Sequence, residues 1–305
     1  MKVQTITDSM IRTKPFLKWA GGKGQLIETI RDSLPGDFAD KKDLCYIEPF
    51  VGSGAVLFWI LDKYSNIKKA IINDVNTDLI NAYRVVKQKP EDLIHLLRRL
   101  QYEYDMLQSN NDRKIFYLEK RDEFNLRASN ELVNASLLIF LNRTCYNGLY
   151  RVNSKNEYNV PFGKYANPGI CDAKTIQTCS AMLQGVTILN DDFSATLKYA
   201  GKNSFYYFDP PYKPVSKSSS FTSYAAESFG DDDQERLAGF CKMLHNRNTQ
   251  WLLSNSDLKN ITAENNYFET LYHGFHIKRV KAKRNINSVS SKRGNIFESL
   301  ISNYQ

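Results

Sequence analysis

Cysteine and histidine are scarce in this chain of 305 residues, which contains five cysteines and four histidines. No two cysteines have the Cys-x-x-Cys spacing, so neither a disulfide framework nor a zinc site is predicted. None follows a proline, which excludes the Pro-Cys nucleophile used by cytosine-C5 methyltransferases. No histidine has a metal-binding spacing with a carboxylate, so we expect no metal ion. The cysteines are expected to be buried small apolar side chains.

Long apolar runs are missing as well. The longest, such as Leu137 to Leu141, fall far short of the roughly 20 residues that span a membrane. The N-terminus lacks a continuous apolar signal segment, so we expect a cytosolic protein without a membrane partner. Hydrophobic content of 42% and charged content of 24% are ordinary for a globular protein. The length predicts one α/β domain with a substantial insertion, or two domains.

Acidic residues are absent between Gly274 and Phe297. The whole chain carries a formal net charge of +8 and a pI near 9.0, which fits a polyanionic partner. Seven cations fall inside the acid-free stretch: Lys278, Arg279, Lys281, Lys283, Arg284, Lys292 and Arg293. A solvated face is the alternative interpretation of such a run. Because no counter-charge is interleaved with these cations, we expect them to contact phosphates.

Strand and helix patterns alternate at the start of the chain. Residues 44 to 74 predict a βαβ unit, with strands at 44–47 and 69–72 around a helix at about 55–63. From 76 to about 125 the pattern predicts successive helices. Another helix is expected at 131–142, followed by a hairpin at 149–163. Alternation resumes in the second half, with strands expected at 186–189, 204–208, 250–254 and 298–301 and a helix near 231–246.

Two glycines follow the first predicted strand, in the turn Glu48-Pro49-Phe50-Val51-Gly52-Ser53-Gly54. Gly52 and Gly54 would let a ligand approach the backbone closely. Asp74 ends the next predicted strand 22 residues after Gly52, in position to accept hydrogen bonds from ribose hydroxyls. NAD sites and S-adenosylmethionine sites share these features. Leu57 stands where the dinucleotide fingerprint needs Gly or Ala, which disfavours tight docking of a pyrophosphate.

A second glycine-containing segment, Phe16 to Gly24, could be mistaken for a phosphate-binding loop. Leu17 occupies the place of the first loop glycine, and Lys23 precedes Gly24 instead of Ser or Thr. Trp19 and Lys23 could instead pack against an adenosine and hold a carboxylate. A simple turn at a helix N-terminus is the alternative.

Asp209-Pro210-Pro211-Tyr212 follows a predicted strand, Ser204 to Phe208, in which four of five residues are aromatic. Asp209 and the Pro210 carbonyl can each accept a hydrogen bond from one NH2 group, and Tyr212 offers a ring on which a base could stack. The four residues therefore predict a site for a planar amine. A surface turn at two prolines is the alternative. The serine-rich stretch between Tyr212 and Asp233 is expected to be a mobile loop beside this site.

Five segments, taken in order, closely resemble the motifs of the Dam-like DNA adenine-N6 methyltransferases. They are Phe16–Lys23, Glu48–Ala55, Asn73-Asp74, the hairpin segments within 147–163, and Asp209–Tyr212. The resemblance spans nearly the whole chain. It implies a Rossmann-like α/β sheet of the class I S-adenosylmethionine-dependent methyltransferases, with an inserted, mostly helical target-recognition domain that carries a β-hairpin. Residues 1–75 and 186–305 would form the catalytic domain, and residues 76–185 the recognition domain.

The resemblance also implies roles for individual residues. Contacts to S-adenosylmethionine are implied for Trp19, Lys23, Glu48, Phe50, Gly52, Gly54, Asp74, Asp192, Phe193 and Asp209. The catalytic residues would be Asp209, Pro210, Pro211 and Tyr212. Contacts to the target are implied for Lys18, Tyr146, Asn147, Leu149, Arg151 and Pro161, and the basic stretch would add Lys281, Arg284 and Arg293 on phosphates. By this resemblance Arg151 reads a guanine, Tyr146 inserts into the base stack, and Asn147 lies beside the orphaned thymine.

The implied reaction is methyl transfer from S-adenosylmethionine to N6 of a flipped-out adenine in double-stranded DNA, usually within GATC. No obligate protein partner is expected, a cognate restriction endonuclease that acts on the same site is the candidate partner, and a monomer is the default. Two alternatives stay open. The chain could methylate another planar amine, in RNA or in a glutamine side chain, or it could be a DNA-binding module that has lost transfer activity. The recognition hairpin and basic stretch favour DNA, and an intact Asp209 favours an enzyme.

Overall fold

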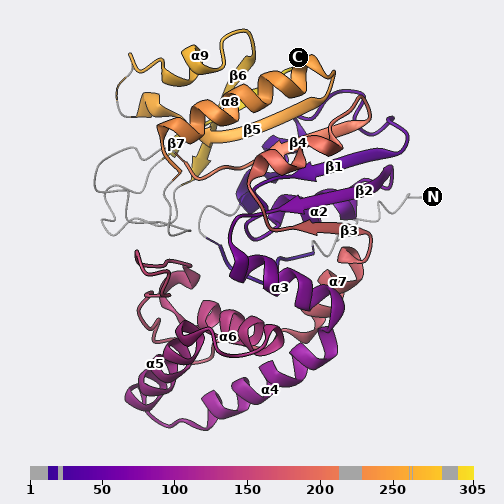
Figure 1. Cartoon of the computed structure of the whole chain (residues 1–305). Helices are drawn as coiled ribbons and strands as arrows, with labels where there is room; N and C mark the ends of the chain where they lie inside the picture. Colours follow the sequence, from indigo (N-terminus) through magenta and orange to yellow (C-terminus); the bar gives the residue numbers. More distant parts are fainter. Residues whose placement is uncertain (1–12, 20–22, 213–228, 261, 263, 284–294) are drawn as a thin grey trace, which may run out of the picture.

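In the described part of the chain, seven strands form one sheet, as the computed structural model in Figure 1 shows. The structure describes residues 13–19, 23–212, 229–260, 262, 264–283 and 295–305. The strand order is β3-β2-β1-β4-β5-β7-β6. The strands are β1 (Leu44–Glu48), β2 (Ile67–Asn73), β3 (Val186–Leu189), β4 (Ser204–Phe208), β5 (Gln250–Ser256), β6 (His276–Lys283) and β7 (Asn295–Ser302). Strands β3, β2, β1, β4 and β5 are parallel, whereas β7 runs antiparallel to both β5 and β6.

The central strands are covered on both faces. All five residues of β4 are buried, as expected for a parallel strand between two layers. Side chains alternate between the faces. Phe205 and Tyr207 pack into the cluster that includes Phe58, from α2 (Ala55–Lys63), while Tyr206 and Phe208 pack with Phe240, from α8 (Asp231–Asn246). The predicted α/β layering is therefore confirmed.

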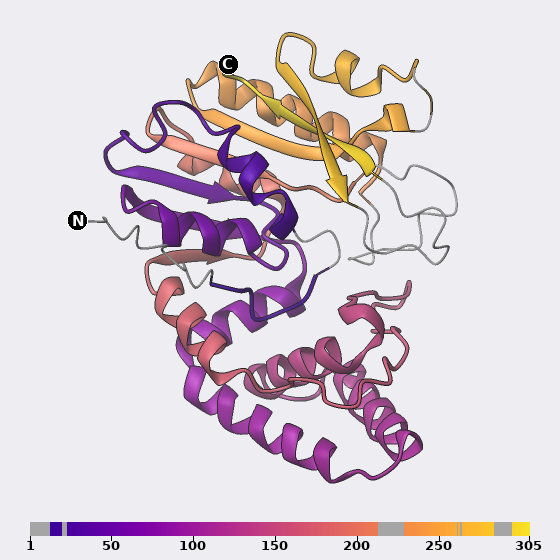
Figure 2. The same cartoon turned by 180° about the vertical axis from the view of Figure 1, so that it is seen from behind.

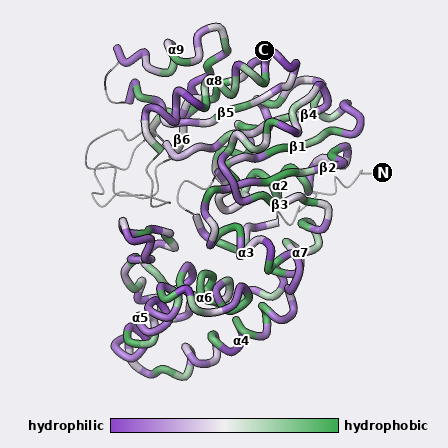
Figure 3. Tube along the Cα trace, viewed as in Figure 1, coloured by the Kyte–Doolittle hydropathy of each residue, from purple (hydrophilic) through white to green (hydrophobic). Residues whose placement is uncertain are grey.

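Helices fill the long connection between β2 and β3. They are α3 (Thr77–Gln88), α4 (Pro90–Met106), α5 (Asn110–Leu126), α6 (Glu131–Thr144) and α7 (Ala173–Leu183). This helical block lies below the sheet in both Figure 1 and Figure 2. Nine residues of α6 are buried. Figure 3 shows hydrophobic stretches along α6 as well as along the central strands. The prediction of a mostly helical insertion is confirmed, and α7 adds a helix that the sequence pattern did not indicate.

Side chains at the helix starts explain where these helices begin. The side chains of Asn76, Ser109, Asn130 and Asp172 each accept a hydrogen bond from a backbone N–H in the first turn of α3, α5, α6 and α7. Pro90 opens α4 in the position where a missing N–H has no cost. The remaining helical segments are short: α1 (Ile27–Arg31), α9 (Tyr267–Leu271) and the 3-10 turns η1 (Lys23–Gln25), η2 (Tyr146–Gly148), η3 (Phe193–Tyr199) and η5 (Leu258–Asn260). None of the helices in the described ranges is long and apolar enough to cross a membrane.

The predicted hairpin lies between α6 and α7. Isolated antiparallel bridges join Cys145 to Phe162 and Val152 to Tyr158. Its tip is a tight turn in which the N–H groups of Asn153 and Asn156 donate to the carbonyls of Glu157 and Asn153. The hairpin is confirmed, although its arms are irregular and bridge at isolated positions.

The basic stretch after Gly274 differs from its prediction. Residues 276–283 form the edge strand β6, which pairs with β7 along its whole length, whereas the sequence pattern predicted a strand only at 298–301. Lysines suit an edge strand, because their charges discourage pairing with another chain. The expectation that all seven cations lack a counter-charge is wrong for Arg279. Its guanidinium forms ion pairs with Asp257 and Glu269, which lie outside the acid-free stretch in sequence.

Candidate active site

Asp209 directly follows β4, at the carboxyl edge of the parallel strands, where the structure gives it two partners. The Lys23 Nζ lies 2.9 Å from Asp209 Oδ1, and the Ser254 hydroxyl donates to the same oxygen at 3.1 Å. Ser254 is fully buried on β5, and its hydroxyl lies 3.2 Å from that of Tyr207. Lys23 and Ser254 therefore fix the position of the carboxylate. The Asp209 side chain is 23% exposed, so part of it remains open.

Tyr212 is held by a residue from the last strand. Its hydroxyl donates to Glu298 Oε2 at 2.6 Å, and Glu298 lies on β7. The ammonium of Lys23 lies 4.3 Å from the centre of the Tyr212 ring and 3.8 Å from Glu298 Oε2. Asp209, Tyr212, Lys23 and Glu298 therefore form one cluster, built from three separate segments of the chain.

The two prolines differ in their surroundings. Pro210 is buried, and its carbonyl has no backbone hydrogen bond to any residue in the described ranges. The carbonyl of Pro211 accepts a hydrogen bond at 3.2 Å from Gln234, which is itself held by Asn255. This difference suits the Pro210 carbonyl, and not that of Pro211, to accept a hydrogen bond from a ligand.

The glycine turn after β1 lies against the end of β2. Asp74 accepts a hydrogen bond on each carboxylate oxygen, from the N–H of Gly52 at 3.1 Å and from the N–H of Asn76 at 3.0 Å. Each oxygen keeps a further lone pair for a ligand hydroxyl. Gly54 has a φ of 74°, and a Cβ there would lie 2.5 Å from the Tyr83 hydroxyl, so this position needs glycine.

Aromatic and apolar groups flank this turn. Trp19 packs against Gly52, and its ring stacks on Tyr150 of the hairpin at 5.2 Å. Phe50 and Phe193 lie 5.5 Å apart by ring centres. Val75, which the sequence analysis missed, is 63% exposed immediately after Asp74. The only feature of the sequence that points to Val75 is its position directly after Asp74.

The Asp192 side chain caps the turn η3, and one of its two carboxylate oxygens already has partners within the protein. Its Oδ1 accepts hydrogen bonds from the N–H of Ser194 and the guanidinium of Arg236, both at 3.0 Å. Arg236 also lies over the ring of Phe193, 5.0 Å from its centre. Oδ2 of Asp192 is therefore the better placed of its two oxygens to accept a hydrogen bond from a ligand.

Three carboxyl groups share the site, of which Glu48 is buried and Asp74 and Asp209 are partly buried. Burial raises the pKa of Asp74 to about 6, against the opposing hydrogen bonds from the N–H groups of Asn76 and Gly52. Burial also raises the pKa of Asp209, which the ammonium of Lys23 and the hydroxyl of Ser254 partly offset. It raises the pKa of Glu48 well above its ordinary value, and Asp209 and Asp74 add to this shift. Glu48 is held by the hydroxyl of Tyr46 at 2.7 Å.

The predicted target-binding residues gather at the base of the hairpin. The backbone N–H of Lys18 donates to the Asn142 side chain, whose amide donates in turn to the carbonyls of Lys18 and Gly148. The Pro161 carbonyl accepts a hydrogen bond from the Tyr146 N–H, and Tyr146 is 53% exposed. The structure therefore brings the segment around Lys18 and the hairpin together.

The other hairpin residues differ in exposure and contacts. Asn147 is exposed in a left-handed conformation with a φ of 56°. Leu149 is half-buried and its carbonyl accepts a hydrogen bond from the Tyr158 hydroxyl. The guanidinium of Arg151 donates to the side chain and the backbone carbonyl of Asn159, at 2.7 and 3.1 Å. Asn159 therefore orients Arg151 from the opposite arm.

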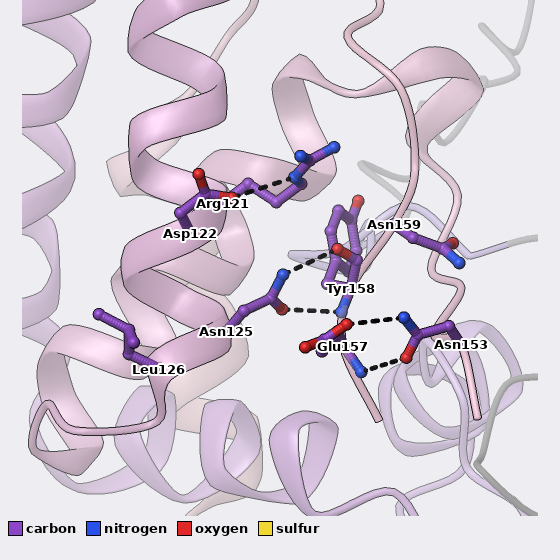
Figure 4. Close-up of a pocket in the computed structure, with 8 residues that line it drawn as sticks. All are labelled: Arg121, Asp122, Asn125, Leu126, Asn153, Glu157, Tyr158 and Asn159. Atoms are coloured by element: carbon purple, nitrogen blue, oxygen red, sulfur yellow. Dashed lines mark hydrogen bonds and ion pairs between the residues drawn. The ribbon is translucent and has the colours of Figure 1, made fainter. Parts of the chain in front are cut away.

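A pocket lies where the hairpin meets α5, and Figure 4 shows its lining. It has a volume of about 320 Å³ and is lined by Arg121, Asp122, Asn125, Leu126, Asn153, Glu157, Tyr158 and Asn159. The Asn125 side chain bonds to both the N–H and the carbonyl of Tyr158, at 2.7 and 3.0 Å. These bonds fix the arm that carries Asn159 to α5. The pocket belongs to the support of the hairpin and does not include Asp209.

Of the three basic residues predicted to contact phosphates, one lies in the described part of the chain. Lys281 is exposed on the edge strand β6. Arg284 and Arg293 lie outside the described residues, as does most of the predicted loop after Tyr212 and the glycine pair at 21–22.

Comparisons with known proteins agree with one another. A family model described as D12 class N6 adenine-specific DNA methyltransferase matches residues 19–286. The chain is 48% identical to the Type II methyltransferase M.MjaIII of Methanocaldococcus jannaschii, covering 96% of this chain and 100% of that protein. It is 38% identical to the Type II methyltransferase M1.LlaDCHI of Lactococcus lactis subsp. cremoris, covering 96% of each chain. A DNA adenine methylase of Haemophilus influenzae is 36% identical, over 94% of this chain and 93% of that protein.

Proposed function

This chain belongs to the D12 class of N6 adenine-specific DNA methyltransferases, and we propose that Asp209, Pro210 and Tyr212 bind the flipped-out adenine of double-stranded DNA. Membership in this family makes the chain an adenine-specific DNA methyltransferase with a class I methyltransferase fold. Its substrate class is DNA. The observation that carries the proposed site is the cluster of Asp209, Tyr212, Lys23 and Glu298 at the carboxyl edge of the sheet. Ligands bind in this place in open α/β sheets.

The residues around the glycine turn fit S-adenosylmethionine, the methyl donor that the family implies. Asp74 would accept hydrogen bonds from ribose hydroxyls, and the exposed Val75 would cover one face of the adenine ring. Phe193 and the open oxygen of Asp192 would border the same ring, and Glu48 would lie under the methionine part. S-adenosylmethionine supplies a methyl group made electrophilic by its bond to a sulfonium.

The target adenine must leave the duplex before its amine can reach Asp209. Flipping costs a few kcal/mol, part of which stacking on Tyr212 would offset. The lone pair of N6 is delocalised into the ring, which makes the amine a poor nucleophile. Hydrogen bonds from both N6 protons to Asp209 and the Pro210 carbonyl would favour the pyramidal nitrogen that attacks, an interaction stronger in the transition state. We propose direct transfer without a covalent enzyme intermediate.

We propose that residues 76–185 recognise the target and that this target is GATC. The hairpin is tied to α5 through Asn125 and to the catalytic side through the stacking of Trp19 on Tyr150. Arg151 would read a guanine, with Asn159 fixing the plane of its guanidinium. Testing methyl transfer to duplexes in which each base pair of GATC is changed in turn checks the target. Loss of transfer at every position supports GATC, and unchanged rates at two positions would point to another sequence.

Arg151→Ala is expected to relax the choice of base at one position of the target. The expected loss of discrimination is about 1 to 3 kcal/mol, the value of a bidentate contact between arginine and guanine. Lys281→Ala is the matched control. Removing this exposed lysine from β6 should weaken binding to all DNA alike and reduce the slope of log affinity against log salt concentration by about 1. Competition binding with single-substituted duplexes measures both effects. The hairpin assignment fails if Arg151→Ala changes affinity for all duplexes equally.

Binding of S-adenosylmethionine is expected to weaken as the pH falls through about 6, the raised pKa of Asp74. Above this pH the carboxylate is ionised and can accept hydrogen bonds from the ribose on both oxygens. Below it Asp74 is protonated and is a poorer acceptor, so Kd should rise by up to about tenfold per pH unit. Calorimetric titration between pH 5 and 8 measures this. Asp74→Asn should bind S-adenosylmethionine more weakly and lose this part of the pH dependence. A pH profile unchanged by this substitution would assign the pH dependence to another group.

We propose a protective role for the enzyme, paired with an endonuclease that cuts the same sequence. The names of the two relatives from M. jannaschii and L. lactis support this role. A monomer is proposed as the acting species, since one chain supplies every residue of the site. Sedimentation of the enzyme on a single-site duplex tests this stoichiometry, and two chains on one site would refute it.

A further inference from the structure

The two oxygens of the Asp209 carboxylate have different surroundings. The Lys23 ammonium lies 2.9 Å from Oδ1, and the Ser254 hydroxyl donates to the same oxygen at 3.1 Å. Within the described part of the chain, Oδ2 has no hydrogen-bond or ion-pair partner. Two donors leave Oδ1 little capacity for a third, so Oδ2 is the oxygen free to accept a hydrogen bond from a ligand amine.

Lys23 is anchored by more than Asp209. Its side chain is only 5% exposed, and its Nζ lies 3.8 Å from Glu298 Oε2. The same ammonium lies over the Tyr212 ring, 4.3 Å from its centre. A buried ammonium that lost its nearest carboxylate would be strongly destabilised. We therefore expect Lys23 to stay on Asp209 when a ligand binds, because the free Oδ2 gives the ligand a place without any movement of the lysine.

Ser254 is the second donor to Oδ1, and it is fixed as well. It is fully buried on β5, and its hydroxyl lies 3.2 Å from the Tyr207 hydroxyl and 3.3 Å from the Phe208 carbonyl oxygen. Lys23 belongs to η1 and Ser254 to β5, so two separate elements hold the same oxygen. Together they fix the orientation of the carboxylate.

We propose that Lys23 and Ser254 are positioning residues that hold Oδ1 of Asp209 throughout the reaction, so that Oδ2 accepts the hydrogen bond from the target amine. The inference rests on the proposed function of Asp209 as the acceptor of that amine. It goes further by assigning the oxygen that the amine uses. It also gives Lys23 a task at the acceptor, besides the cofactor contact that the family resemblance implies.

The charge of Lys23 also favours the ionised form of Asp209, which is the stronger acceptor. Burial raises the pKa of Asp209, while the Lys23 ammonium and then the Ser254 hydroxyl lower it. Among the described residues, Lys23 is the one cation in contact with this carboxyl. The other titratable groups near it are acids and phenols: Glu48, Glu298, Tyr46, Tyr207 and Tyr212. Removing the charge of Lys23 should therefore raise the pKa of Asp209 further.

The pH dependence of single-turnover methyl transfer tests this role. At saturating S-adenosylmethionine and duplex, the profile reports the groups of the complex and not those of the free enzyme. The native rate should fall as the pH drops through the pKa of Asp209. Lys23→Gln keeps a hydrogen-bond donor but removes the charge, so this fall should move to a pH about one unit or more higher. Ser254→Ala should move it in the same direction by less, because a hydrogen bond is lost and no charge.

An unmoved profile would contradict the proposal. If Lys23→Gln lowers the rate equally at every pH, the lysine either leaves Asp209 in the complex or acts only elsewhere, and the proposal is wrong. The affinity for S-adenosylmethionine is measured at each pH to keep the enzyme saturated. Lys63→Gln, at an exposed lysine that ends α2, is the matched control and should leave the profile unchanged. Thermal unfolding confirms folding, and Ser254→Ala carries the same test if Lys23→Gln does not fold.

Binding of the amine gives a readout that needs no turnover. Affinity is compared for duplexes that carry adenine or 2′-deoxynebularine, which lacks the amine, at the target position. The ratio of the two affinities is followed with pH, so the constant cost of opening each base pair cancels. The preference for adenine should weaken as Asp209 is protonated, and in Lys23→Gln it should weaken at a pH about one unit higher. A preference that weakens at the same pH in both proteins contradicts the proposal.

Asp209→Asn separates failure of this inference from failure of the proposed function. Its lower rate should no longer fall with pH in this range, and adding Lys23→Gln should have an effect of the same size at every pH. A fall that persists in Asp209→Asn, or a native enzyme that methylates no adenine, refutes the proposed function. If the fall disappears in Asp209→Asn but moves in neither Lys23→Gln nor Ser254→Ala, this inference alone is refuted.

Discussion

Replacing Asp209 with alanine is expected to abolish methyl transfer, with a fall in the single-turnover rate of at least about a hundredfold. The variant loses the charged acceptor aimed at the reacting amine, and removal of one such preorganised group typically costs about 10²–10³ in rate. Binding of duplex DNA should be retained, because Asp209 follows β4 while most of the predicted target contacts lie on the hairpin. Transfer of labelled methyl groups together with a DNA-binding measurement checks both parts.

One further variant separates the charge of Asp209 from its shape, and another is a control outside the site. Asp209→Asn keeps a carbonyl oxygen for the amine but loses the negative charge, so it should retain more activity than alanine while remaining well below the native rate. Asp62→Ala removes an exposed aspartate on α2, outside the site, and should leave the rate within about twofold. Turnover retained in Asp209→Ala would show that the acceptor of the amine lies elsewhere.

Alanine at Gly54 is expected to destabilise the protein by about 2 to 4 kcal/mol, the sum of a strained backbone and a steric clash. The backbone has a φ of 74°, which side chains other than glycine rarely adopt. A Cβ would also lie 2.5 Å from the Tyr83 hydroxyl, which holds the turn by donating to the carbonyl of Gly52 at 3.0 Å. Chemical denaturation measures the loss, and calorimetry should show weakened binding of S-adenosylmethionine.

Gly239→Ala is the control for this substitution. Gly239 lies inside α8, and a Cβ there meets no atom within 4 Å. Alanine should therefore stabilise the protein by roughly 0.5 to 1 kcal/mol, because glycine is unfavourable in a helix interior. Equal stability of the Gly54→Ala and native proteins would mean that the turn tolerates a side chain and that its conformation does not depend on glycine.

Local patterns predicted most of the fold. The aromatic run at β4 and the turn with Gly52 and Gly54 carry their own signals, because a strand period and a need for positive φ depend on few neighbours. The amphipathic face of α3 and the proline at the start of α4 are local in the same way. The hairpin was also predictable, although its irregular bridges were not.

Contacts between distant segments account for what the sequence did not show. Residues 276–283 looked like a charged surface because the partner strand β7 begins twelve residues later and the acids that pair with Arg279 lie earlier in the chain. The cluster at Asp209 joins Lys23, Ser254 and Glu298, which no spacing rule connects. One feature of the sequence does point to Glu298: it is the first acidic residue after a long acid-free stretch, and it lies in a predicted strand.

Transfer of labelled methyl groups from S-adenosylmethionine, followed by digestion of the product to nucleosides, tests the central claim most directly. Four substrates are compared: a GATC duplex, the same duplex already methylated at N6 of the target adenines, an RNA and a protein. We predict that label enters only the unmethylated duplex and is recovered as N6-methyldeoxyadenosine. Label in RNA or protein, or no label in any substrate despite tight binding to the duplex, would contradict it.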